Sequence, residues 1–518
     1  MTTSNDSSSG DTVAIYRFVP LGLIVLIGAG LRFHGIAREP LWFDEAATLR
    51  CADLTLSQLW GQPCDPSPPL YYTVQKLWLL FGRSEVALRS LSAVVGTLSI
   101  LITYALGRYL AGTLAGLVSA GLLATSPLHV GYSQEARGYA LLTAVSMLAI
   151  WGLVRILERS SPGEDEAASS QSWYARPGSI AGSDYIGWFA YVFGGICALY
   201  THNTAALLII LSNLALCGWW AMSLRFNRRF ALHWLVANTF ILAAWSWWIP
   251  VIIAQMGLGL QDFWLKRPSP ITAVHTVANV YGQLYFFVGQ PYVTLTFIAL
   301  GIVGMVRVFS RRLWPATLLT IILVFVPIIS YVISFHTPIF MLRTISWPLP
   351  AFVILVAIGM TSMRPWFLAT TAIAIAIGIQ SIALTNYLDY PIRNEPWDEV
   401  VKTIQNSTDR QSAVLFCAAD SEIPFSYYAI RSNLLIAMRG IATPDEPAWH
   451  KLHKPINHIR TIAVDQIRTF VAPFRTIWLI ERLCEPIASI TDEVTRDYDL
   501  IRSDWMGGLR ITLFRKHS

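Results

Sequence analysis

The sequence VAIYRFVPLGLIVLIGAGLRFHGI, residues 13–36, leads into AREPLWFDE, residues 37–45. The first stretch is long enough to cross a hydrocarbon core of about 30 Å. It is too long for the core of a signal peptide, and no small-residue cleavage pattern follows it, so we expect a retained first transmembrane span. The second stretch puts two adjacent carboxylates, Asp44 and Glu45, beside the bilayer, where taking them out of water is costly. Such a pair either faces water or lies in a polar cavity whose chemistry requires a base or an anion.

The composition is that of a membrane protein. Of the 518 residues, 54% are hydrophobic and 14% charged, with a mean hydropathy of +0.49, which leaves too little polar surface for soluble domains. The net charge of +6 does not indicate nucleic-acid binding, because the arginines gather in short loops and form no basic patch interleaved with aromatic residues. The six cysteines lack the CxxC or His-rich spacing of a structural zinc site.

About eleven apolar runs are long enough to span a bilayer. They lie near residues 16–36, 86–107, 112–128, 138–157, 185–201, 204–222, 232–253, 285–306, 316–335, 344–361 and 366–386. The glycine-flanked segment Gly107–Gly112 separates the second run from the third. We therefore predict an α-helical polytopic membrane protein with about eleven transmembrane helices.

The distribution of basic residues predicts the orientation. Threading the chain back and forth collects one set of arginines on a single face: Arg108, Arg155, Arg159, Arg225, Arg228, Arg229, Arg307, Arg311, Arg312 and Arg364. By the positive-inside rule this face is the cytoplasm, although longer segments on the opposite face also carry Arg38, Arg50, Arg83, Lys266 and Arg267. We expect a multi-pass protein of the inner (plasma) membrane with a cytoplasmic N-terminus and an extracytoplasmic C-terminus.

The same threading suggests a domain organisation. Residues 1–15 form a cytoplasmic tail, 16–386 a transmembrane catalytic domain, and 387–518 a small extracytoplasmic α/β domain with strands near 413–419, 476–480 and 511–514 and a helix near 397–404. Within the first domain, the outer loop 37–85 has the apolar spacing of short interfacial helices near 54–60 and 71–81. Residues 160–184, rich in Ser, Gly, Pro and acids, indicate a flexible cytoplasmic linker.

Polar residues from distant segments share the outer face in this topology. They are Asp44, Glu45, Arg89, Gln134, Glu135, Arg137, Tyr139, His202, Asn203, His336 and Arg343. Arginine holds a phosphate in a bidentate, charge-assisted way, and a partly desolvated carboxylate takes a proton from an attacking hydroxyl. A pocket of this composition at the outer leaflet suits a lipid-linked phosphate substrate.

Each of these residues also has a structural interpretation. Asp44 and Glu45 are compatible with the first turn of an exposed helix, where acids favour the helix dipole. Arg137 is compatible with an ion pair to Glu135 or with snorkelling to lipid headgroups. Three further residues also have possible structural roles: Arg89, His202 and His336. An aromatic set suits a belt at the membrane interface: Trp42, Trp60, Tyr71, Tyr72 and Trp78.

Six segments in order carry a resemblance to a known family. They are Leu31-Arg32-Phe33, Trp42-Phe43-Asp44-Glu45-Ala46, Pro68-Pro69-Leu70-Tyr71-Tyr72, Gln134-Glu135-Ala136-Arg137-Gly138-Tyr139, Leu199-Tyr200-Thr201-His202 and Pro338-Ile339-Phe340-Met341-Leu342-Arg343. Over roughly residues 15–390 the chain resembles the polytopic GT-C glycosyltransferases, which include the dolichyl-phosphate-mannose protein mannosyltransferases and the bacterial lipid A aminoarabinose transferases. The ordered set is specific, although each motif alone is weak.

The resemblance implies an activity and assigns roles. Members of this family move a sugar from a polyprenyl-phosphate donor to an acceptor hydroxyl of a lipid, glycan or protein on the extracytoplasmic face, with inversion. By resemblance, the catalytic pair is Asp44 and Glu45; the donor phosphate is bound by Arg137, Arg343 and Arg89; and the substrate pocket is lined by Pro68, Pro69, Tyr71, Tyr72, Glu135, Tyr139 and His202. No cofactor is implied, and a divalent metal is possible but without support.

The chain departs from the family pattern at two positions. The family often has His before the Pro-Pro pair, where this chain has Ser67, and an Arg-Tyr pair where this chain has Arg343-Thr344. The main alternative function is a transporter or flippase of lipid-linked sugars without catalysis, for which internal repeats and charges at mid-bilayer would be expected. A membrane scaffold that acts through its C-terminal domain is a second alternative, which leaves the ordered outer-face set without a purpose.

The cysteines carry a separate expectation. Cys51 shares the first outer loop with Cys64, and Cys417 shares the C-terminal domain with Cys484, all on the side inferred to be oxidising. We therefore expect some of them to be oxidised in pairs.

The orientation can be tested with a reporter that is active only outside the cytoplasm. We expect activity when the reporter is fused after Ser518 and silence when it is fused within residues 160–184, because an odd number of spans puts these sites on opposite sides. The reverse pattern would separate the acidic pair from the extracytoplasmic face.

Overall fold

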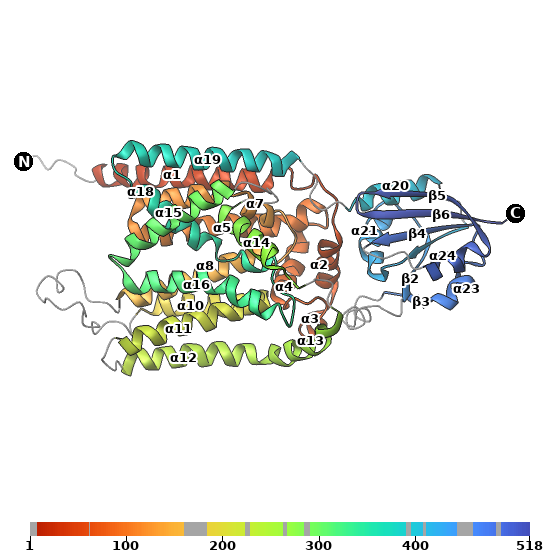
Figure 1. Ribbon diagram of the computed structural model, residues 1–518, viewed down its shortest axis with the longest axis horizontal. Helices are drawn as coiled ribbons and strands as arrows, with labels where there is room; N and C mark the ends of the chain where they lie inside the picture. The colour runs from red at the N-terminus through yellow and green to blue at the C-terminus, as the bar shows by residue number, and fades with distance from the viewer. Residues whose placement is uncertain are drawn as a thin grey trace, which may run out of the picture. The chain divides into compact units, whose positions relative to one another are not determined.

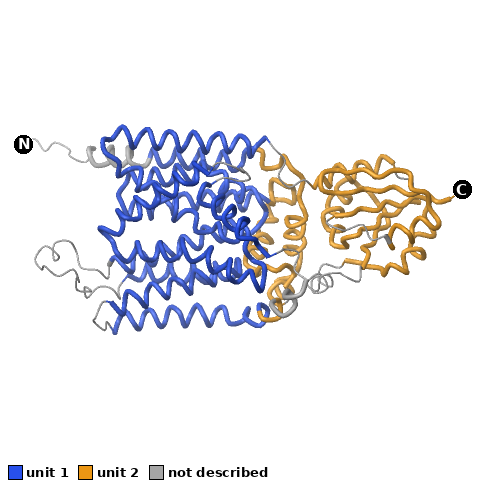
Figure 2. The backbone as a smooth tube through the Cα atoms, viewed as in Figure 1, with its two compact units in different colours: residues 1–34, 89–252, 265–390 blue, residues 35–88, 253–264, 391–518 orange. Residues whose placement is uncertain are grey.

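The computed structural model describes residues 8–61, 63–159, 184–222, 228–262, 267–283, 291–389, 395–407, 411–442, 459–482 and 488–517. The chain divides into two compact units, coloured separately in Figure 2. Unit 1 comprises residues 1–34, 89–252 and 265–390, and unit 2 comprises residues 35–88, 253–264 and 391–518. Each unit is described by itself.

Unit 1 is a helical bundle (Figure 1). The helices that lie wholly or mostly in it are α1 (Ser8–Phe33), α5 (Glu85–Ala111), α6 (Thr113–Thr125), α7 (Pro127–Ser133), α8 (Tyr139–Arg159), α10 (Tyr185–Thr201), η3 (Asn203–Ala205), α11 (Ala206–Met222), α12 (Arg228–Trp245), η4 (Ser246–Trp248), α14 (Pro270–Gly282), α15 (Pro291–Phe309), α16 (Leu313–Ile333), α17 (Leu342–Ile345), α18 (Leu349–Thr361) and α19 (Trp366–Asp389). Among the described residues, 7 helices are long and apolar enough to cross a membrane, or up to 8 if α6 and α7 form one bent span. Three shorter apolar helices lie at Val19–Phe33, Tyr185–Thr201 and Leu349–Thr361, so the chain is a multi-pass membrane protein, as predicted.

Glycine and proline set the breaks between several helices. The break predicted over Gly107–Gly112 is narrower than expected, because α5 continues to Ala111 and Gly112 alone separates it from α6, with φ of 88°, a conformation that favours glycine. The run expected over 112–128 is not one straight helix, because α6 ends at Thr125 and α7 leaves it at 61°. Pro127 begins α7, where a missing amide costs no helical hydrogen bond. The span expected from residue 344 begins only at Leu349, because Pro348 disfavours helical geometry at Trp347.

Helices α15 and α18 approach each other closely enough to exclude side chains at their contact. A Cβ atom added at Gly304 would lie 1.8 Å from the carbonyl oxygen of Leu355, and one at Gly359 would lie 2.1 Å from that of Leu300. Small residues permit this backbone approach, which is a principal source of helix packing energy in a lipid environment.

The C-terminal part of unit 2 is a six-stranded sheet with helices on both faces. The strands are β1 (Ser412–Phe416), β2 (Ala437–Ala442), β3 (Thr461–Ala463), β4 (Thr476–Arg482), β5 (Tyr498–Met506) and β6 (Leu509–Lys516), in the order β3-β2-β1-β4-β6-β5. β1 pairs in parallel with both β2 and β4, and β2 with β3, whereas β6 is antiparallel to β4 and to β5. The predicted small α/β domain is thus present, with β2, β3 and β5 in addition to the strands expected.

Alternate residues of the central strands pack against different helices. Ala413, Leu415 and Leu479 share a buried cluster with α23 (Ile467–Val471) and α24 (Ala488–Thr495). On the other face, Phe416 contacts Phe425 of α21 (Glu422–Arg431), with ring centroids 5.3 Å apart, and α21 packs against α20 (Trp397–Ser407). Short 3-10 segments η5 (Ala419–Ser421) and η6 (Val464–Gln466) precede α21 and α23.

The first loop forms the remainder of unit 2 and is mainly helical. Its elements are α2 (Phe43–Asp53), α3 (Leu56–Gly61), α4 (Leu70–Trp78) and η1 (Leu79–Phe81), together with most of α13 (Ile249–Asp262) from later in the chain. The two helices expected in this loop are therefore present as α3 and as α4 with η1. Leu80 and Phe81 are 88% and 72% exposed, as suits an apolar edge available to lipid.

The close contact between α15 and α18 predicts the effect of one methyl group. We expect Gly304→Ala to lower stability by about 1 to 3 kcal/mol, because the added carbon has to push the Leu355 backbone away. Thermal unfolding of the detergent-solubilised protein measures this. Gly378→Ala on α19 is the matched control, since no atom lies within 4 Å of the added carbon. An equal loss in both variants would contradict the packing argument.

Candidate functional site

The residues expected at the site fall into two groups. Arg89, Glu135, Arg137, Tyr139, His202 and Arg343 belong to unit 1, and Asp44, Glu45, Pro68, Pro69, Tyr71 and Tyr72 belong to unit 2.

Tyr139 brings three residues of the first group together. It begins α8, and its ring centroid lies 6.1 Å from that of His202 and 5.8 Å from the guanidinium carbon of Arg343. Tyr132, at the end of α7, contacts the same ring edge-on at 5.3 Å. A guanidinium held over an aromatic face keeps its planar fork in a defined orientation, which suits recognition of an anion with two oxygens.

His202 is fixed by hydrogen bonds in the turn that follows α10. Its Nδ1 accepts from the backbone amide of Thr204 at 3.2 Å and lies 2.9 Å from the Thr204 hydroxyl. The acceptance from an amide assigns the proton of a neutral ring to Nε2. His202 therefore both caps the turn and packs against the Tyr139 ring.

Charged residues of the first group are buried at the turn between α7 and α8 and at the start of α5. Arg89 has no exposed surface, and Glu135 and Arg137 are 4% and 6% exposed. The hydroxyl of Ser92, one turn after Arg89, donates to the carbonyl of Arg137 at 3.2 Å and thereby ties α5 to this turn. Snorkelling of Arg137 to lipid headgroups does not fit such burial.

Gln134 organises the same turn, and the sequence analysis assigned it no role of its own. Its side-chain amide donates to the carbonyls of Leu31, Arg32 and His34 at 3.2, 3.2 and 2.8 Å, and its oxygen accepts from the Tyr387 hydroxyl at 2.9 Å. These bonds satisfy the last carbonyls of α1 and link that helix to α19. Its place directly before Glu135 in a conspicuous polar run is the signal that pointed to it.

A second buried network explains the arginine in the first motif of the resemblance. Arg32 donates to the carbonyl of Gly28 at 2.8 Å and contacts His129 Nδ1 at 2.8 Å. Because a guanidinium only donates, Nδ1 is the acceptor, and Nε2 is free to donate to the Ser99 hydroxyl at 3.1 Å. Arg32 therefore joins α1 to α7, and this network is structural.

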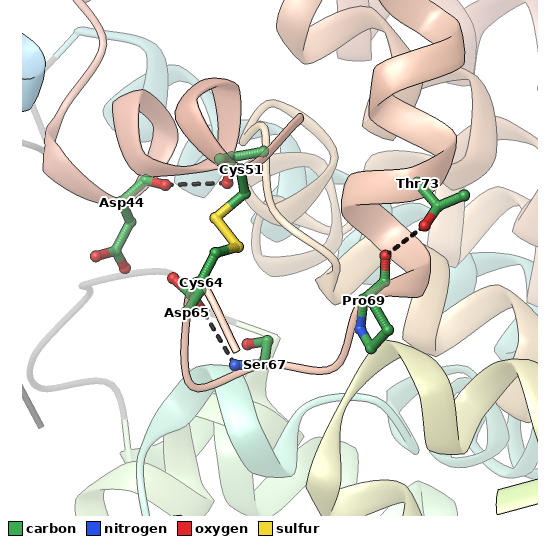
Figure 3. The surroundings of a disulfide bond; sticks show 8 residues. Asp44, Cys51, Cys64, Asp65, Ser67, Pro69 and Thr73 are labelled. Atoms are coloured by element: carbon green, nitrogen blue, oxygen red, sulfur yellow. Dashed lines mark hydrogen bonds between the residues drawn. A yellow bond between two sulfur atoms is a disulfide. The ribbon is translucent and has the colours of Figure 1, made fainter. Parts of the chain in front are cut away.

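In unit 2 the acidic pair lies in the first turn of α2. Glu45 has no exposed surface, and Asp44 is half-buried, so the exposed helix considered from the sequence is wrong. The helix is anchored at its far end by a disulfide between Cys51 and Cys64 (Figure 3). The disulfide confirms the pairing expected in this loop and fixes the end of α2 opposite to Asp44.

The prolines and tyrosines of the loop shape its second helix. Pro68 and Pro69 are buried directly before α4, and Tyr71 and Tyr72 are each 2% exposed, with ring centroids 6.2 Å apart. Gln75, one turn further along α4, is fully buried, and neither of its side-chain polar atoms has a hydrogen-bond partner. Such a group carries a desolvation penalty unless a ligand or water meets it. No motif singled Gln75 out, and only its spacing from Tyr71 and Tyr72 places it beside them.

The other cysteines agree in part with the expectation. Cys417 is disulfide-bonded, while Cys484, its expected partner, lies outside the described residues. Cys197 and Cys217 are free. Within the described ranges, no group of three or more His, Cys, Asp or Glu side chains is arranged to hold a metal ion.

Comparisons with known proteins identify one matching family model and several solved structures with a similar fold. A family model for the dolichyl-phosphate-mannose-protein mannosyltransferases matches residues 65–164. The apo structure of ArnT from Cupriavidus metallidurans is similar with a TM-score of 0.64 at 14% identity over 98% of this chain and 98% of that chain. The structure of the same protein bound to undecaprenyl phosphate gives 0.63 at 14% identity over 96% and 98%. The apo oligosaccharyltransferase of Archaeoglobus fulgidus gives 0.50 at 13% identity over 89% and 69%. A comparison with curated proteins found no match.

The fold is that of the GT-C glycosyltransferases. The resemblance seen in the sequence and the predicted fold class are thereby confirmed, while the number of spans stays a prediction. Within this fold, unit 1 supplies the buried Arg89 and Arg137, and the half-buried Arg343 over the Tyr139 ring, which suits the binding of an anionic group. Unit 2 supplies a carboxylate on a covalently anchored helix, which suits proton abstraction.

Proposed function

We propose that this chain is an integral membrane glycosyltransferase that moves a sugar from a polyprenyl-phosphate donor to a hydroxyl of a lipid, glycan or protein. The observation that carries the proposal is a fold shared along 98% of both chains with ArnT, a protein that also has a structure bound to undecaprenyl phosphate. The buried arginines of unit 1 and the carboxylates of unit 2 support a chemistry that needs both an anion site and a base. The sugar is a hexose or pentose.

The proposed reaction is a single in-line displacement. The acceptor oxygen bonds to the anomeric carbon as the bond from that carbon to the donor phosphate oxygen breaks, which inverts the configuration. The acceptor proton passes to Asp44, with Glu45 beside it, and the electron pair of the broken bond leaves with the phosphate. Arg137, Arg343 and Arg89 stabilise the phosphate charge as it grows, which is electrostatic catalysis by preorganised donors.

The remaining pocket residues have supporting roles in this proposal. Pro68 and Pro69 fix the start of α4, while Tyr71 and Tyr72 give the donor site its apolar wall. Glu135, Tyr139 and His202 surround the arginines of unit 1. The reaction takes place at the extracytoplasmic face of the inner (plasma) membrane, with the N-terminus in the cytoplasm and the C-terminal domain outside.

The first step of the test identifies the product. Mass spectrometry of surface glycolipids and glycoproteins from a strain lacking this chain, compared with the parent strain, reveals a modification that depends on the chain. The purified protein is then assayed for transfer of the missing group from a polyprenyl-phosphate donor. If the chain is a transporter of lipid-linked sugars, the purified protein will show no such transfer.

The second step tests the base. We expect Asp44→Asn to fail to restore the missing modification and to lower the transfer rate by about 10² to 10⁴, because an amide accepts no proton at neutral pH. Binding of undecaprenyl phosphate to the purified variant should match the parent. Asp53→Asn, at the exposed end of the same helix, is the matched control and should retain activity. More than about half of the parent activity in Asp44→Asn would exclude the assignment.

The third step tests the anion site. We expect Arg137→Lys to weaken donor binding and slow transfer, each by about tenfold, because a point charge cannot reproduce a bidentate fork. Steady-state kinetics with donor as the variable substrate measure both effects. Arg83→Lys, in an exposed ion pair with Asp53, is the control for the same change in side chain. Unchanged KM and kcat in Arg137→Lys would return Arg137 to a structural role.

A further inference from the structure

The sheet of unit 2 reverses its order of winding next to β1. From β1 the chain proceeds to β2 and then to β3 on one side, and then returns to place β4 on the opposite side of β1. In doubly wound sheets the connections diverge at such a point, and the crevice beyond the carboxyl ends of the two strands is the usual ligand site. Here β1 ends at Phe416 and β4 ends at Arg482.

The first loop of the chain occupies the position next to Arg482. The guanidinium carbon of Arg482 lies 4.5 Å from the ring centroid of Phe43, the first residue of α2. The backbone amide of Leu41 donates to the Tyr428 hydroxyl at 2.6 Å, and α2 packs against α21. A segment that precedes the acidic pair by one to three residues is thus held at the edge of the sheet where a ligand would be expected.

Glu395 joins α2 to β4 through both of its carboxylate oxygens. Oε1 accepts from Nε of Arg482 at 2.8 Å, in an ion pair whose side chains are only 12% and 10% exposed. Oε2 accepts from the backbone amide of Phe43 and from Nε1 of Trp397, each at 3.0 Å. Trp42, at the N-cap position of α2, provides no side-chain cap, so the carboxylate of Glu395 caps this helix from a segment 352 residues away.

The electrostatics around Arg482 fit this arrangement. Burial alone would lower the pKa of Arg482, but the negative charges of Glu395, Asp420 and Asp44 and the hydrogen bond to Glu395 raise it. The guanidinium therefore stays charged and faces a set of carboxylates that includes Asp44. A second anchor lies nearby: burial raises the pKa of Tyr428, whose protonated hydroxyl donates to Glu85 at 3.1 Å while it accepts from Leu41.

We propose that Glu395 and Arg482 are positioning residues, which cap and hold α2 so that Asp44 in its first turn is presented in one orientation for proton transfer. The proposal rests on the proposed function for the role of Asp44, but the anchoring of α2 stands independently of it. The carboxyl edge of this sheet is thereby used to hold the chain's own base-bearing helix rather than a separate nucleotide or cofactor. Displacement of a catalytic group by as little as about 1 Å costs about 10²-fold in rate, so an anchor of this kind affects turnover directly.

The test uses the full-length protein in detergent with two readouts. Hydrogen exchange measured by mass spectrometry on peptides covering residues 41–50 reports the anchoring of α2 without any assay of activity. We expect Glu395→Ala and Arg482→Ala to speed exchange in this segment by about tenfold or more, because a charge-assisted cap is lost. We expect both variants to lower kcat by at least about tenfold while the donor KM changes by less than about twofold, because the phosphate-binding arginines are untouched.

Two further variants calibrate these readouts. Glu395→Gln keeps an oxygen that can accept from the Phe43 amide but loses the ion pair. Its exchange rate in residues 41–50 and its kcat should therefore fall between those of the parent and of Glu395→Ala. It is also the variant to use if Arg482→Ala does not fold. Glu481→Gln is the matched control. Glu481 precedes Arg482 on β4 and points to the other face of the sheet, and its substitution breaks an ion pair with Arg510 at 3.5 Å. It should leave exchange in residues 41–50 unchanged.

The outcomes separate the two proposals. Unchanged exchange in residues 41–50 in both Glu395 variants would overturn the anchoring. Faster exchange with unchanged kcat in an active enzyme would overturn the positioning role, because Asp44 would then work without the anchor. If the parent protein transfers no sugar, and exchange in residues 41–50 is still faster in the Glu395 variants than in the parent, the proposed function is overturned while the anchoring of α2 is supported.

Discussion

A charged side chain that leaves water loses several kcal/mol of hydration unless nearby groups replace it. This protein buries Glu45, Arg89, Glu135 and Arg137 almost completely, next to segments that lie in a membrane. The backbone segments that carry two of these side chains are fixed by other groups: the helix carrying Glu45 is anchored by a disulfide and capped by Glu395, and the carbonyl of Arg137 accepts from Ser92.

Features that depend on neighbours in sequence could be predicted. The length of an apolar run indicates a span regardless of what surrounds it, and Gly112 ends a helix through its own backbone conformation. Pro127 is a comparable local signal for the bend between α6 and α7, but the bend was not predicted because the apolar run continues past it. The small α/β domain was recognised from its buried strands, whereas β5 was missed because most of it is exposed and it lacks a continuous apolar pattern.

Features that depend on distant residues could not be predicted. Asp44, Arg137 and Arg343 were found as candidates because chemistry restricts which residue types bind phosphate or accept protons. Gln75 resembles any polar residue of a helix until its burial without a partner is seen. Glu395 is one acid among many in the sequence, and only the fold brings it to the amide of Phe43.

The arrangement of unit 2 suggests what the sheet contributes to the first loop of the chain. With 11 residues, α2 is too short to be stable alone. The disulfide fixes its C-terminal end, but the acidic pair lies at the opposite end, where a helix frays first. The mixed sheet offers a charged anchor, Arg482 at the end of β4, for that first turn. The domain therefore stabilises the part of the loop that the disulfide cannot reach, and this is the part that carries the carboxylates.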